Sequence, residues 1–123
     1  MARLLRAVPR SSLAILGLIA VAACDRSTRP IEGDFGGIHY WGWESSGFRG
    51  CLASETWWMT GELRPIFDAL FPDAPRPVEG AAYIRVRGTR STRGRYGHLG
   101  AYPYELVVHE VLDVSADTVG KCR

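Results

Sequence analysis

The sequence predicts a mainly β protein: a small closed or half-closed barrel of about five strands with one short helix, behind a cleaved leader. Three observations support this prediction. Aromatic and β-branched residues cluster in short runs that glycines interrupt, which is typical of bent strands. A single segment in the middle of the chain has the apolar spacing of a helix. The N-terminus has the charge and hydropathy pattern of a secretory signal.

The first 23 residues have the layout of a signal peptide. Arg3, Arg6 and Arg10 form a basic start without acidic residues, and the apolar segment 13–23 follows. This segment is too short for a membrane-spanning helix, which needs roughly 20 apolar residues. A basic start, an apolar stretch and small residues before the cut are the features of a secretory leader. We therefore expect residues 1–23 to be removed as a lipoprotein signal peptide.

The run Val-Ala-Ala-Cys at positions 21–24 resembles the bacterial lipobox, in which a diacylglycerol is joined to the cysteine sulfur and the leader is cut just before it. The resemblance implies that Cys24 starts the mature chain and anchors it to the inner or the outer membrane, with the domain facing the periplasm or the exterior. Two acyl chains make such attachment stable, because each buried CH₂ contributes about 0.8 kcal/mol. The alternative is an ordinary signal peptide with a chance cysteine.

Residues 24–34 are polar without periodicity, and they predict a lipidated N-terminus followed by a tether. Residues 35–123 suit one domain, because a second core would have too little apolar material. The chain has a formal charge of +2. Three of its 15 basic residues lie in the leader, so 12 remain against 13 acidic residues. The domain is therefore nearly neutral, and we expect no nucleic-acid partner.

The first part of the domain predicts two strands. Residues 35–44 are rich in aromatic residues and are interrupted by glycines, which indicates a strongly bent strand. Residues 45–47, Ser-Ser-Gly, predict a turn or a bulge. Residues 54–60 form the second strand candidate, because they contain two tryptophans and two threonines.

One short helix is predicted between residues 63 and 71. Its apolar residues recur at the spacing of a helix face. They are Leu63, Ile66, Phe67, Leu70 and Phe71. Pro65 fits the first turn, and Pro72 ends the segment. We expect this helix to plug an open end of the sheet or barrel, with a rigid proline-rich loop at 73–80 after it.

The second half of the domain predicts two more strands around a loop rich in glycine and arginine at 89–100. Residues 82–88 alternate with a period of two, which places Ile84 and Val86 on the inner face.

The last strand, residues 104–114, is the longest. Its alternation places Leu106, Val108 and Leu112 on one face. Glu110 falls on that same face, which implies a bulge or an edge position.

A helix between the third and the fourth strand is also a feature of the OB-fold, a small five-stranded barrel. Phe48, Cys51, the Trp57-Trp58 pair and the run 94–102 resemble small bacterial lipoprotein domains of unknown function. The placing of Cys51 and Cys122 is similar to that in the C-terminal OB-like domain of the NlpE family, envelope lipoproteins linked to copper and surface stress. The Cys-x-x-Cys of that family's N-terminal domain has no counterpart in this sequence.

The three cysteines divide into one anchor and one pair. With Cys24 assigned to lipid, Cys51 and Cys122 remain, and an oxidising compartment favours a disulfide between them. Closing a loop of roughly 70 residues stabilises a protein by about 4 kcal/mol in the chain-entropy model. Two free thiols or a metal pair are the alternatives, and the spacing matches no zinc motif.

Arginine and tryptophan side chains form the predicted binding surface. No acidic residue lies between Gly80 and Tyr104, and neighbouring tryptophans on one strand point to opposite faces. Such a surface suits another envelope protein or an anionic lipid or glycan. The alternative is a solvated strand face beside a loop. The residues concerned are Arg85, Arg87, Arg90, Arg93, Arg95, Trp57 and Trp58.

His39, His98 and His109 are the weak candidates for a copper or zinc site, because they lie on separate segments without HxH or HxxxH spacing. No GxSxG, P-loop or GxGxxG motif is present, so we predict no enzymatic activity and no cofactor. The predicted function is therefore a lipid-anchored, non-enzymatic binding or structural module of the bacterial envelope. The alternative is an envelope lipoprotein that binds a small ligand or a metal.

Overall fold

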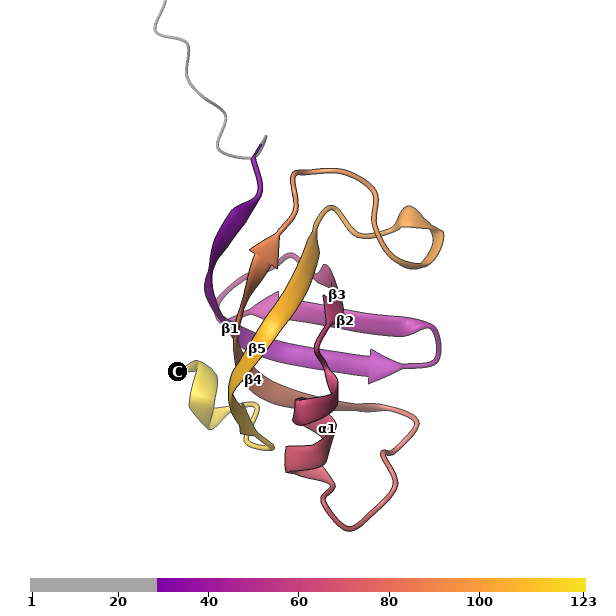
Figure 1. Ribbon diagram of the computed structural model, residues 1–123, viewed down its shortest axis with the longest axis vertical. Coiled ribbons are helices and arrows are strands. Elements are labelled where there is room, and N and C mark those ends of the chain that lie inside the picture. The colour runs from indigo at the N-terminus through magenta and orange to yellow at the C-terminus, as the bar shows by residue number, and fades with distance from the viewer. Residues whose placement is uncertain (1–28) are drawn as a thin grey trace, which may run out of the picture.

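The computed structural model describes residues 29–123. In these residues five strands form a closed barrel in the order β1-β2-β3-β5-β4, with one short α-helix (Figure 1). The elements are β1 (Ile31–Gly42), β2 (Ser45–Gly50), β3 (Trp57–Gly61), α1 (Arg64–Leu70), β4 (Gly80–Arg90), β5 (Glu105–Ser115) and two 3-10 turns, η2 (His98–Gly100) and η3 (Gly120–Cys122). The helix lies between β3 and β4, and β3 pairs in parallel with β5. The predicted OB-like barrel is confirmed.

The predicted signal peptide and Cys24 lie outside the described residues. None of the helices between residues 29 and 123 has the length and apolar character needed to cross a membrane.

Strand β1 is long enough to pair with two neighbours. It pairs with β4 from Ile31 to Trp41 and with β2 from Gly37 onward. A Cβ added at Gly37 would lie 2.7 Å from the Cα of Gly50, so only glycine allows this close approach of β1 and β2. Residues 31–34, which we expected in the tether, instead belong to the barrel because they pair with the end of β4.

The turn between β1 and β2 lies before the predicted position. Ser45–Gly50 is already strand β2, and the turn consists of Trp43 and Glu44, with Glu44 at φ 52°. The prediction of a turn or bulge at 45–47 is therefore wrong. The prediction failed because the sequence does not show where the ladder between β1 and β2 closes.

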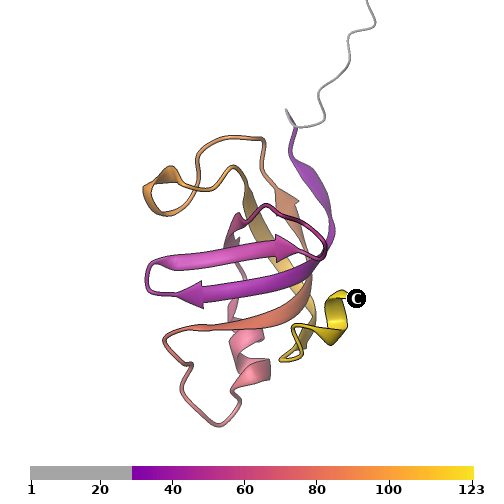
Figure 2. The same ribbon diagram turned by 180° about the vertical axis from the view of Figure 1, so that it is seen from behind.

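Helix α1 closes one end of the barrel, as predicted (Figure 2). Pro65 lies in its first turn, where a missing N–H costs no hydrogen bond. Ile66 is fully buried in the core, and Leu63 and Leu70 pack against the same core. Phe67 packs edge-on against Trp41 of β1, with 5.3 Å between the ring centroids. The apolar residues whose spacing predicted the helix thus form the face of α1 that covers the barrel.

The buried side chains of β4 and β5 form most of the barrel interior. Ile84 and Val86 are fully buried on the inner face, as the alternation predicted. In β5, Leu106 and Val108 share one face as predicted, and both are buried. Leu112 does not share this face, because two register shifts turn this part of the strand.

The register shifts are bulges in β5. Arg85 pairs with Asp113 and the next residue pairs with Val111, so Leu112 is skipped. His109 is skipped in the same way between Glu110 and Val108. Each extra residue moves the following side chains to the other face, and Val111 and Val114 therefore pack against the core. The bulge inferred from Glu110 is confirmed.

Candidate functional site

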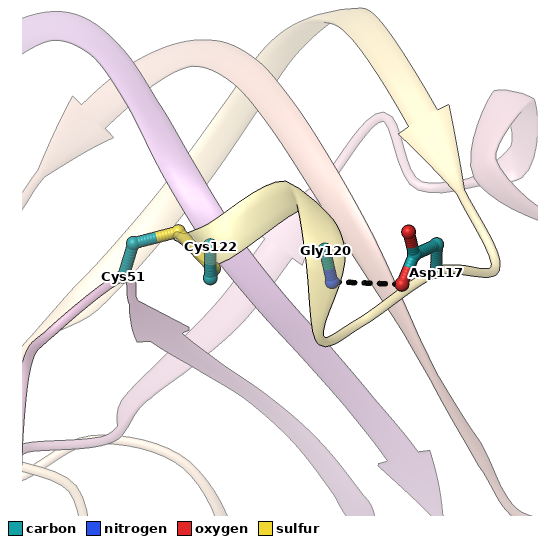
Figure 3. The surroundings of a disulfide bond; sticks show 4 residues. All are labelled: Cys51, Asp117, Gly120 and Cys122. Atoms are coloured by element: carbon teal, nitrogen blue, oxygen red, sulfur yellow. Dashed lines mark hydrogen bonds between the residues drawn. A yellow bond between two sulfur atoms is a disulfide. The ribbon is translucent and has the colours of Figure 1, made fainter.

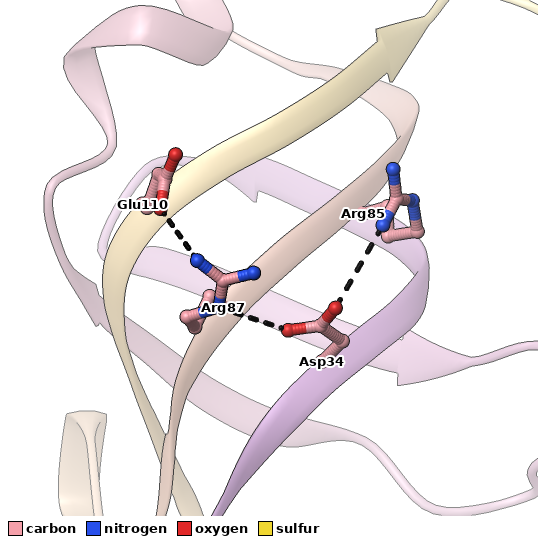
Figure 4. A network of polar contacts seen from close by, with 4 residues as sticks. All are labelled: Asp34, Arg85, Arg87 and Glu110. Atoms are coloured by element: carbon pink, nitrogen blue, oxygen red, sulfur yellow. Dashed lines mark hydrogen bonds and ion pairs between the residues drawn. The ribbon is translucent and has the colours of Figure 1, made fainter.

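The predicted arginine and tryptophan surface divides into three parts. Arg85 and Arg87 lie on the outer wall of β4, where two carboxylates balance them (Figure 4). Arg87 donates from Nη1 to Glu110 Oε2 at 2.9 Å and from Nε to Asp34 Oδ1 at 3.2 Å. Arg85 Nη1 lies 3.8 Å from Asp34 Oδ2. These exposed pairs contribute little to stability, and they neutralise this part of the surface.

The second part closes the end of the barrel opposite α1. Arg90 continues the inward-facing series of β4 beyond the last apolar position. Its guanidinium carbon lies 4.4 Å from the ring centroid of Tyr104 and 5.5 Å from that of Trp57. The guanidinium of Arg93 lies 5.7 Å from the same Tyr104 ring. We call Trp57, Arg90, Arg93 and Tyr104 the mouth cluster.

The guanidinium of Arg90 contacts aromatic rings rather than carboxylates. Arg90 forms no ion pair with the described residues, and its buried Nε has no hydrogen-bond partner among them. The faces of Tyr104 and Trp57 therefore offer the main compensation for this cation. Glu55 accepts a hydrogen bond from Trp57 Nε1 at 3.0 Å and lies 3.9 Å from Arg93 Nη1. Arg93 thus has one distant carboxylate, and it remains largely exposed.

The third part is the loop between β4 and β5, residues 91–104, which folds back onto β3. Trp58 points away from the core and packs against Tyr102, with 5.3 Å between the ring centroids. Gly97, at φ 69°, passes so close to the Trp58 indole that an added Cβ would overlap the ring. Tyr96 and Tyr102 exchange two backbone hydrogen bonds, which brace the loop. Trp58 is therefore half-covered by the loop.

Arg95, Leu99 and Trp43 are among the side chains that remain exposed around this loop. Arg95 is exposed and forms no ion pair with any described residue. Leu99 is 84% exposed and adopts a φ of 56°. Trp43 is 82% exposed in the turn between β1 and β2, and a contact of 3.5 Å between His98 Nε2 and Glu44 Oε2 links that turn to the loop.

Sequence reasoning missed Trp43 and Leu99 as surface residues. Trp41, two positions before Trp43, is only 7% exposed. The alternation of β1 ends at Gly42, so Trp43 no longer follows the inner face. Its position directly before a charged residue and two serines was the signal that a turn was near.

The three histidines have different surroundings and do not form one site. His109 Nε2 lies 2.8 Å from Thr89 Oγ1 on the outer wall, and His98 contacts Glu44. His39 is fully buried between Trp41 and Phe67. Residues 29–123 contain no group of three or more potential metal ligands.

Burial sets the protonation of His39. Its removal from water, and secondly the positive charge of Arg76, lower its pKa from 6.5 to about 4. Its Nε2 lies 3.4 Å from Ser46 Oγ, while its Nδ1 has no hydrogen-bond partner in the described part of the chain. His39 is therefore a neutral core residue at physiological pH.

Cys51 and Cys122 lie at disulfide-bonding distance, with 5.1 Å between their Cα atoms (Figure 3). Cys51 follows β2, and Cys122 lies in η3 near the end of the chain. Asp117 Oδ1 accepts a hydrogen bond from the backbone N–H of Gly120 at 2.8 Å, which stabilises the turn before Cys122. The pair joins residues 71 positions apart, and it braces the C-terminal turn against the barrel.

One shallow, open depression lies between α1 and β5 and is lined by Pro65, Ala69 and Leu112 among others. Asp113 is the one ionisable side chain among the residues that line it. Comparisons with protein-family models, with curated proteins and with solved structures found no match. The fold and the surface define the class of protein as a small OB-like barrel with an arginine-rich mouth.

Proposed function

We propose that this chain is a lipid-anchored protein of the bacterial envelope whose barrel acts as a non-enzymatic binding module. The run at 21–24, which resembles a lipobox, supports the anchor. The single observation that supports binding is the difference in ion pairing among the arginines. Arg85 and Arg87 are paired with carboxylates, whereas Arg90 and Arg95 form no ion pair with the described residues. Arg90, which lies beside aromatic rings, and Arg95, which is exposed, suit an anionic or polar ligand.

The alternative, a small-ligand or metal-binding lipoprotein, receives no support from the geometry. A metal site would require His39, His98 and His109 to approach one another, and each has a different set of neighbours. The similarity to the NlpE C-terminal domain also stays a prediction.

Labelling with radioactive palmitate tests the anchor. The full chain, expressed in a bacterium, should incorporate palmitate and fractionate with membranes. The variant Cys24→Ala should lose both properties. Unchanged labelling of this variant would contradict the proposed anchor.

Photo-crosslinking in cells tests the binding surface. A photo-reactive residue at position 95 should give a discrete adduct with another envelope component. The same residue at position 85, on the neutralised wall of β4, is the matched control and should give none. Identical patterns at the two positions would contradict the assignment of the mouth end as the binding surface.

A further inference from the structure

The start of β1 lies directly beside the end of β4. Ile31, which is among the first described residues, pairs with Arg90, the last residue of β4. The chain that comes from Cys24 therefore enters the barrel next to the mouth cluster and next to the first residue of the β4–β5 loop. Figures 1 and 2 show the start of β1 and this loop at the same end of the barrel, with α1 at the other end.

The distance from the proposed anchor to this point is short. Cys24 and Ile31 are separated by seven residue steps. Even a fully extended chain of this length spans only about 25 Å, because each residue adds at most about 3.6 Å. This reach is shorter than the diameter of a domain of this size, which is about 31 Å for a compact sphere with a radius of gyration of about 12 Å. The end at which the chain enters the barrel therefore stays nearest to the bilayer.

The two ends of the barrel differ in charge. Among the described residues, the mouth end has four arginines against four carboxylates, so its formal charges balance. These are Arg29, Arg90, Arg93 and Arg95 against Glu32, Glu44, Glu55 and Glu105, where Glu44 lies 3.5 Å from His98 of the 91–104 loop. The helix end is acidic, with two arginines against four carboxylates. These are Arg64 and Arg76 against Glu62, Asp68, Asp73 and Glu79.

The loop that extends from the mouth end has the composition of a membrane-contacting segment. Residues 91–104 contain Arg93 and Arg95 and no acidic residue, and both arginines are exposed. The same loop holds Leu99 in solvent at a positive φ. Arginine near an anionic lipid surface gains electrostatic attraction, and its guanidinium forms two-pronged hydrogen bonds with phosphate oxygens.

We propose that the mouth end of the barrel rests on the membrane that holds the anchor, and that Arg93 and Arg95 bind the headgroups of anionic phospholipids. This inference rests on the lipid anchor of the proposed function and names the partner of the same surface. It also orients the molecule: the acidic helix end, with α1, points away from the bilayer.

Hydrogen–deuterium exchange of the full lipidated protein in vesicles tests this orientation. One vesicle preparation contains only phosphatidylcholine, and the other contains one third phosphatidylglycerol. We expect peptides from residues 91–104 to exchange several-fold more slowly in the anionic vesicles, whereas peptides from residues 62–79 exchange equally in both. High salt should abolish the difference, because it screens exposed charges.

Charge-matched variants identify the residues responsible. Arg93→Ala combined with Arg95→Ala should remove the slow exchange of the loop. Arg85→Ala combined with Arg87→Ala removes the same charge from the neutralised wall, and it should leave the slow exchange unchanged. Equal loss in both double variants would overturn the assignment to Arg93 and Arg95.

Three other outcomes would overturn the inference. These are equal exchange of residues 91–104 in the two vesicle preparations, slower exchange of residues 62–79 instead, and slow loop exchange in native membranes but in neither vesicle preparation. The last result would indicate a protein partner. Flotation separates this inference from the anchor: a chain that does not float with phosphatidylcholine vesicles contradicts the anchor itself. A chain that floats without a slowed loop contradicts only the orientation.

Discussion

The two ends of the barrel are both closed by aromatic rings, but the ionisable group at each end has a different protonation state. His39 at the helix end is neutral, and Arg90 at the mouth end is charged. At the helix end, Trp41 and Phe67 pack beneath α1 and enclose His39. At the mouth end, Trp57 and Tyr104 pack at 5.8 Å, and Arg90 lies over both rings. The helix removes His39 from water, which makes its charged form unfavourable. The mouth has no helix over it, and Arg90 keeps its charge there against ring faces. The helix end also has a cation on a ring, since Arg76 lies 4.4 Å from the Phe67 centroid, and its charge further disfavours protonation of His39.

The helix end, which the apolar face of α1 covers, contributes stability, and its buried His39 carries no charge at neutral pH. The mouth end, where Arg90 lies over the rings, retains a positive charge near the surface that a ligand can reach. The following predictions test this division, beginning with the disulfide that joins Cys51 to the C-terminal turn.

Removal of the disulfide should have the largest effect. Cys51→Ser combined with Cys122→Ser should lower the free energy of unfolding by about 4 kcal/mol, because a cross-link over 71 residues restricts the unfolded chain. Urea denaturation gives the size of the loss. Hydrogen exchange should show that both ends weaken equally, and a loss confined to one end would show that the two ends unfold separately.

Truncation of the helix plug should come next. Ile66→Ala removes a fully buried side chain and should cost about 3 kcal/mol, from lost burial and from the cavity that remains. The control is Leu99→Ala in the exposed loop of the mouth end, which should change stability by less than about 0.5 kcal/mol. Equal losses from the two variants in urea denaturation would contradict the view that α1 belongs to the core and the loop of the mouth end does not.

Acid should weaken the helix end through His39. Its pKa is lowered from 6.5 to about 4, so between these values the unfolded chain binds a proton that the native barrel does not. The stability contributed by neutral His39 is complete above pH 6.5 and is lost as the pH falls toward 4. The loss is about 3 kcal/mol when one pKa unit equals about 1.4 kcal/mol.

The variant His39→Leu should remove this part of the pH dependence. His109→Leu, which changes a histidine on the outer wall, is the control and should retain it. Urea midpoints measured above and below this pH range provide the comparison. If His39→Leu retained the full acid sensitivity of the native chain, the helix end would not be the acid-sensitive end.

Removal of the mouth cation should have the smallest effect on stability. Arg90→Met keeps an apolar stem over Tyr104 and Trp57, and it removes a buried Nε that has no partner among the described residues. We expect the free energy of unfolding to change by less than about 1 kcal/mol, the usual size of an exposed cation–π contact. A loss of stability as large as that of Ile66→Ala would mean that Arg90 is a structural plug.

Several parts of the fold were predictable because they depend on local sequence. Helix α1 follows from the spacing of Ile66 and its apolar neighbours and from Pro65 and Pro72, which act within one turn of the chain. The inner positions Ile84 and Val86 follow from strict alternation. The partnership of Cys51 and Cys122 followed from elimination once Cys24 was assigned to lipid. Each inference uses neighbours in the sequence or simple counting.

The sequence by itself determined the class of fold, the single helix, the period of β4 and the inventory of arginines. Only the tertiary structure decided that residues 31–34 join the barrel, that two bulges turn β5, and that carboxylates neutralise Arg85 and Arg87 but leave Arg95 without an ion pair among the described residues. The physical reason is the distance along the chain over which each effect acts. Period and propensity act between neighbours along the chain, whereas strand register and charge pairing depend on which distant segments meet when the barrel closes.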